Sequence, residues 1–84
     1  MLEHEQLARL RAAAIPESGN RVALAIKLVA RQQGEVAEAL GMSQSHLSDI
    51  CRGRFLNPQL NTLQKLASYF GCQIEDLFPV RQEV

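Results

Sequence analysis

The strongest constraint on the fold is a pair of short helical patterns on either side of Gly41. Residues 33–40 and 44–52 each place apolar side chains at helical spacing, and only three residues, from Gly41 to Ser43, separate them. Glycine readily adopts the positive φ that ends a helix, and serine is a preferred N-cap. Ala37 is small enough to lie where the two helices cross. The sequence therefore predicts two short helices joined by a tight turn.

Further helical patterns flank this pair, and no alternating strand pattern is present. These patterns predict helices over Leu2–Ala14, Arg21–Arg31, Leu60–Phe70 and Ile74–Phe78. Ser18 or Asn20 is expected to cap the helix over Arg21–Arg31. Gly53 is expected to end the helix over residues 44–52, and Gly71 the helix over Leu60–Phe70. The prediction is an all-α fold with an N-terminal extension over residues 1–19, a compact domain over 20–79 and a tail over 80–84.

Length and composition narrow the functional classes. The 84 residues suffice for one small domain. No apolar run approaches the roughly 20 residues that span a bilayer, and the acidic, polar N-terminus does not resemble a secretory signal. Cys51 and Cys72 lack the local four-ligand spacing of a zinc site, so we expect two small buried hydrophobic residues and no metal. A cytoplasmic protein without a membrane segment is expected.

The formal net charge is zero, but the charges are unevenly distributed. Residues 21–60 carry five basic and three acidic side chains, whereas each flanking region carries one acid more than its bases. No acid lies between Arg52 and Lys65. One surface can therefore present positive charge to phosphate groups.

The outward face of the second paired helix carries short or planar hydrogen-bonding side chains. These positions are Gln44, Ser45, Ser48, Asp49 and Arg52. Such side chains are suited to the donors and acceptors at base edges in the major groove. A face that only meets solvent is more often rich in Glu and Lys spaced as i,i+4 pairs. The pattern favours recognition of nucleic acid.

The segment from Gln33 to Ile50, QGEVAEALGMSQSHLSDI, resembles the core of the lambda-repressor-like (Xre/Cro) helix-turn-helix family. The resemblance continues through RGR at 52–54, Asn57-Pro58, LQKLA at 63–67 and IEDLF at 74–78, so it covers roughly residues 21–79. It implies a compact five-helix lambda-repressor-like domain, preceded here by an extra N-terminal helical segment. The implied function is transcriptional regulation, as a repressor that binds a palindromic operator in double-stranded DNA as a homodimer.

The resemblance also implies roles for individual residues. Gln44 and Ser45 match positions that contact bases, and glutamine is suited to bidentate contact with adenine. The positions that match phosphate-binding residues are Gln33, Ser43, Arg52, Arg54 and Asn57. Asp49 either accepts a hydrogen bond from cytosine, orients Ser45, or is simply a solvated acid. His46 flanks the helix, either close to phosphate or without a role.

The chain departs from the family at several positions. Many members pair an Arg in the first core helix with a Glu, where this sequence has Ile26 and Cys51. Apolar replacement of a buried ion pair is often neutral or stabilising, so the same fold is expected. Residues 31–32 also differ from the usual pattern, and residues 1–19 are additional to the minimal domain. This extra segment either extends the core or forms a surface for a protein partner.

Two functional classes follow. No phosphate-binding loop, nucleophile with an adjacent base or paired-carboxylate arrangement is present, so neither an enzyme nor a cofactor is expected. The alternative to a dimeric repressor is an antitoxin-type regulator whose termini bind a protein partner. For the dimer, we expect the contact between the two copies around Ile74, Leu77, Phe78 and Val80. Leu77 could instead be buried in the core of the domain. The N-terminal helix is the alternative location for the dimer contact.

Overall fold

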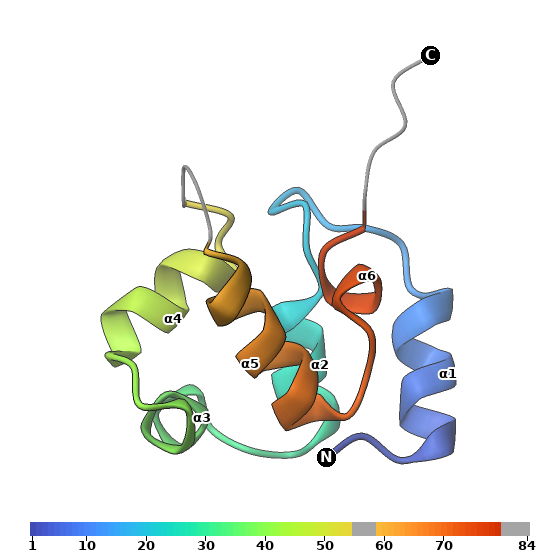
Figure 1. Ribbon diagram of the computed structural model, residues 1–84. Coiled ribbons are helices and arrows are strands. Elements are labelled where there is room, and N and C mark those ends of the chain that lie inside the picture. Colours follow the sequence, from blue (N-terminus) through green and yellow to red (C-terminus); the bar gives the residue numbers. More distant parts are fainter. Residues whose placement is uncertain (55–58, 80–84) are drawn as a thin grey trace.

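The computed structural model describes residues 1–54 and 59–79 (Figure 1). These residues form six helices and no strand, which confirms the predicted all-α class. The helices are α1 (His4–Ala12), α2 (Val22–Leu28), α3 (Gln33–Leu40), α4 (Gln44–Cys51), α5 (Leu60–Phe70) and α6 (Ile74–Leu77). The bounds of α3 and α5 are as predicted, and the other four helices are shorter. Within the described ranges, no helix is long and apolar enough to cross a membrane.

Three helices end in the same hydrogen-bonded motif at a glycine. Gly41, Gly53 and Gly71 have φ values of 68°, 75° and 72°. Each donates its N–H to the carbonyl three residues earlier, and the next residue donates to the carbonyl five residues earlier. This is the Schellman arrangement, which satisfies carbonyls that a helix end leaves without partners. The predicted terminators of α3, α4 and α5 are confirmed.

Helix α2 ends in the same motif without a glycine, and the predicted end at Arg31 is wrong. Ala30 has a φ of 55°, donates to the Lys27 carbonyl, and is followed by an Arg31 N–H that bonds to the Ile26 carbonyl. A left-handed conformation costs about 1–2 kcal/mol in a residue with a side chain. The rest of the fold has to offset this cost, and local sequence preference did not reveal it.

All six helices contribute to one apolar core. The α3–α4 pair lies at one edge of the molecule and α1 at the opposite edge, with α2, α5 and α6 between them (Figure 1). The core residues are Leu2, Leu10, Val22, Ala25, Ile26, Val36, Ala37, Leu47, Ile50, Cys51, Leu66, Phe70 and Leu77. The sequence places these residues at helical spacing, so each helix buries one stripe.

The N-terminal segment is part of this core. Leu10 is fully buried, Leu2 retains 7% of its exposure, and the Leu2 N–H donates to the Phe70 carbonyl at 2.8 Å. The Gln6 amide donates to the Leu28 carbonyl at the end of α2, at 2.7 Å. Of the two interpretations of residues 1–19, these contacts support an extension of the core.

Charged side chains fasten α1 to α6 and α2. The Arg11 guanidinium forms two hydrogen bonds with the Asp76 carboxylate, at 2.9 and 3.2 Å. Arg21 donates to the Ala13 carbonyl beyond α1, at 2.8 Å, and to the Asp76 carbonyl, at 3.3 Å. Asp76 also caps α6 by accepting from the Gln73 N–H. The Arg11 contact and this cap hold the pKa of Asp76 below its usual value.

Candidate nucleic-acid interface

The α3–α4 pair has the geometry of a helix-turn-helix. Val36 and Ala37 of α3 and Leu47 of α4 are buried, with at most 2% exposure. The small Ala37 side chain lets the two helices approach closely. The Ser43 hydroxyl accepts a hydrogen bond from the His46 N–H at 3.1 Å, so the predicted cap of α4 is confirmed. Local signals thus set both the turn and the start of α4.

A buried asparagine attaches α4 to the rest of the molecule. Asn20 is 2% exposed, and its amide donates to the Ile50 carbonyl at 2.8 Å. Its side-chain oxygen accepts from the Val22 N–H at 3.0 Å, which satisfies a free donor at the start of α2. The N-cap position of α2 is Arg21, whose side chain forms no cap bond, so the prediction of Ser18 or Asn20 at that position is wrong by at least one residue. Asn20 nevertheless supplies the acceptor for the first helical N–H from the preceding position. The sequence did not predict the bond between Asn20 and Ile50, because these residues are 30 positions apart and only the fold brings them together.

The structure brings together most of the predicted contact residues on the outer side of α4. Exposed side chains at the start of α4 are Ser43, Gln44, Ser45 and His46, and those at its end are Arg52 and Arg54. Ser48 and Asp49 are half-buried on the same helix. Asn57, the remaining predicted contact, lies outside the described residues. The assignment of these residues to base or phosphate contacts stays a prediction.

Gln33 occupies a more enclosed position than the others. It is half-buried at the first position of α3, near the Cys51 thiol at the end of α4. Burial raises the pKa of Cys51, and the neighbouring Gln33 side chain opposes that rise in part. Gln33 therefore lies where α3 meets the end of α4, a position that the sequence did not suggest. Its predicted phosphate contact stays a prediction.

The charges around α4 leave its arginines available. The ion pairs found within residues 1–54 and 59–79 are Arg11–Asp76 and Arg31–Glu35. Arg52 and Arg54 take part in neither, and the first turn of α4 contains no acid. Positive charge beside a helix face of small polar groups is an arrangement that attracts a polyanion.

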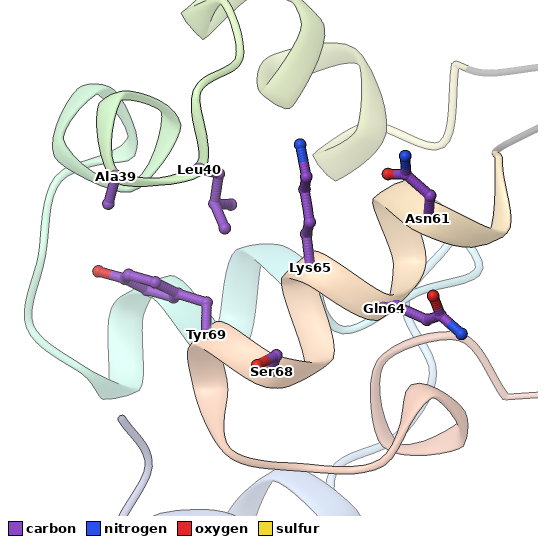
Figure 2. A pocket seen from close by; sticks show the side chains of 7 residues that line it. All are labelled: Ala39, Leu40, Asn61, Gln64, Lys65, Ser68 and Tyr69. Atoms are coloured by element: carbon purple, nitrogen blue, oxygen red, sulfur yellow. The ribbon is translucent and has the colours of Figure 1, made fainter.

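An open groove of about 650 Å³ lies beside the helix-turn-helix, between α3 and α5. Figure 2 shows the side chains of Lys65 and Tyr69 rising from α5 toward Ala39 and Leu40 of α3. The groove is also lined by Asn61, Gln64 and Ser68. None of the residues that line the groove is among the predicted DNA contacts.

The cysteines and the last helix require two corrections. Both cysteines are free, and Cys51 is buried as predicted. Cys72 is only half-buried, although burial is sufficient to raise its pKa to about 11.

Leu77 is fully buried, so it cannot form the dimer contact that was predicted for it. Ile74 and Phe78 are half-buried, and Val80 lies outside the described residues. Among the described side chains, no group of three His, Cys, Asp or Glu is placed to hold a metal.

Comparison with known proteins identifies the fold and the family. A family model described as helix-turn-helix matches residues 24–77. The chain belongs to the lambda-repressor-like (Xre/Cro) helix-turn-helix family. A solution structure of the SOS-response transcriptional repressor LexA from Eubacterium rectale is similar over the whole chain and 83% of its own, with a TM-score of 0.63. Its sequence identity is 22%, so this likeness concerns the fold.

Two curated relatives each match about half of the chain. The HTH-type transcriptional regulator DdrOP3 of Deinococcus deserti is 49% identical over 43 residues, which are 51% of this chain and 33% of that protein. The ImmF control region 10 kDa protein of Bacillus phage phi105 is 44% identical over 46 residues, 55% of this chain and 50% of that protein. The matched segments thus span a third and a half of these relatives.

Proposed function

We propose that this helix-turn-helix protein binds double-stranded DNA with sequence specificity through α4 and thereby regulates transcription. The observation that carries the proposal is the composition of the exposed α4 face. Gln44 and Ser45 offer planar or short hydrogen-bonding groups, and Arg52 and Arg54 lie exposed at the end of the same helix. The first group is suited to base edges and the second to phosphates. The proposed activity is binding, without catalysis.

Repression is the regulatory mode we propose. The names of the relatives support it, since one is a transcriptional regulator and the other comes from a phage control region. A protein that occupies an operator blocks access to that DNA without needing a further active surface. The antitoxin-type alternative gains no support from α1, because its buried leucine faces the core and its exposed positions include Glu5 and Arg9.

We further propose that the protein acts as a homodimer on a palindromic operator. One recognition helix reads only a few base pairs, which is too little information to select one operator in a genome. Two copies related by a two-fold axis would place their α4 helices in successive major grooves, with half-sites centred roughly 10 base pairs apart. Since Leu77 is buried, the self-contact must use other residues. Sedimentation of the operator complex tests this: one protomer on a site without an inverted repeat would refute the dimer.

The test of DNA binding is selection from a pool of random duplexes, followed by titration of the selected duplex at several salt concentrations. We expect affinity on the order of nanomolar at physiological salt, falling steeply as salt rises. Recovery of no enriched duplex at low salt would refute the proposed function.

Two substitutions separate base contacts from phosphate contacts. Gln44→Ala should cost about 1–3 kcal/mol on the selected duplex and relax discrimination at one base pair. Arg54→Ala should weaken all duplexes about equally and lower the salt slope by about 1. Arg9→Ala removes the same charge from α1, at the opposite edge of the molecule, and should leave the slope unchanged. Equal effects of Gln44→Ala on all duplexes would show that Gln44 reads no base.

A further inference from the structure

The side chain of Gln44 lies over the first turn of α3. Gln44 is the first residue of α4, and Gly34 is the second residue of α3. A methyl group added at Gly34 would lie 3.2 Å from Oε1, 3.6 Å from Cδ and 3.9 Å from Nε2 of Gln44. The Oε1 atom of Gln44 therefore lies tight against the position of a Cβ atom at residue 34, whereas Cδ and Nε2 lie at ordinary contact distances.

Gly34 is unusual among the glycines of this chain. The sequence has five, and the other four have positive φ values of 68° to 81°, a conformation that favours glycine. Gly34 lies within α3 at an ordinary helical φ, where alanine would be the more stable residue. Backbone conformation thus does not account for a glycine here. The Gln44 amide is the nearest group to this position, and an alanine methyl group would require it to shift by a few tenths of an ångström.

We propose that Gly34 is a positioning residue for Gln44, and that its missing side chain lets the base-reading amide lie against the first turn of α3 before DNA binds. A bidentate contact with adenine needs Oε1 and Nε2 in a defined plane. Orientation by α3 reduces the rotamer freedom that Gln44 loses on binding. This inference rests on the proposed function, because it assigns a reason for the specificity of the same α4 face.

The substitution Gly34→Ala tests the inference because its effects on stability and specificity have opposite signs. Alanine favours the helix, and the exposed Gln44 side chain can rotate away, so we expect Tm to rise by roughly 2–8 °C. The displaced amide should lower the preference for the selected duplex over its variant at the Gln44 base pair by about fivefold or more. Preferences at other base pairs should be unchanged.

A matched control separates positioning from stabilisation. Ala30→Gly relieves the left-handed residue after α2 and is also expected to stabilise the fold, but it adds no atom that could displace the Gln44 amide. It should leave discrimination at every base pair as in the wild type. In a Gln44→Ala background, Gly34→Ala should have no further effect on discrimination, because the group that it displaces is absent.

Nuclear Overhauser effects in the free protein test the contact without DNA. We expect cross-peaks between the Gln44 side-chain amide protons and the Gly34 α-protons, and their loss in Gly34→Ala. Absence of these cross-peaks in the wild type, or unchanged discrimination in Gly34→Ala, overturns the positioning role. Failure of the wild type to select any duplex overturns the proposed function instead, while the cross-peaks still decide where Gln44 lies.

Discussion

Asn20→Ala should be among the most destabilising single substitutions in this protein. The substitution removes the amide that donates to Ile50 at 2.8 Å and the oxygen that accepts from Val22 at 3.0 Å. The Ile50 carbonyl keeps a second donor, the Gly53 N–H at 3.0 Å, whereas the Val22 N–H loses its side-chain acceptor. A buried donor without a partner costs about 1–3 kcal/mol, and an ordinary lost hydrogen bond about 0.5–1.5 kcal/mol.

The expected loss in the free energy of unfolding is thus about 1.5–4.5 kcal/mol, the sum of these two contributions. A domain of this size has a total stability of roughly 4–13 kcal/mol, so the loss is a large fraction of it. Urea unfolding followed by far-ultraviolet circular dichroism measures the change directly, provided that the slope with urea stays constant.

Two further variants make this measurement decisive. Asn61→Ala removes the same side chain from an exposed position on α5 and should change stability by less than about 0.5 kcal/mol. Asn20→Asp keeps an acceptor for the Val22 N–H but places a carboxylate against the Ile50 carbonyl, so it should destabilise at neutral pH at least as much as Asn20→Ala. If Asn20→Ala were as stable as Asn61→Ala, Asn20 would not support α4.

Two further predictions concern stability. The pKa of Asp76 is lowered in the folded protein, so its contribution is present above its ordinary pKa of 3.8 and is lost as pH falls through the lower folded value. Asp76→Asn should therefore lower stability at pH 7 and flatten the acid limb of a stability profile from urea unfolding; an unchanged limb would contradict the assignment. Gly53→Ala should cost about 2 kcal/mol or more, because φ is 75° and the new methyl group would collide with the Ser18 carbonyl. A Tm within about 2 °C of the wild type would exclude that collision.

The sequence by itself determined the features that depend on neighbouring residues. The end of α3 follows from Gly41, the start of α4 from Ser43, and the end of α5 from Gly71. In each case the hydrogen bonds that begin or end the helix lie within five residues, so composition and spacing suffice to predict them. The family resemblance rests on the same segment, which is why family and fold class could be predicted from the sequence.

Only the tertiary structure decided the contacts between distant segments. The Asn20–Ile50 bond spans 30 residues, and the Arg11–Asp76 pair spans 65. The left-handed Ala30, and the closeness of the Gln44 amide to Gly34, could likewise be seen only in the assembled structure. Sequence periodicity shows which face of a helix is apolar but not which helix covers it. The attachment of α1 and the orientation of the α4 side chains therefore depend on the assembled fold.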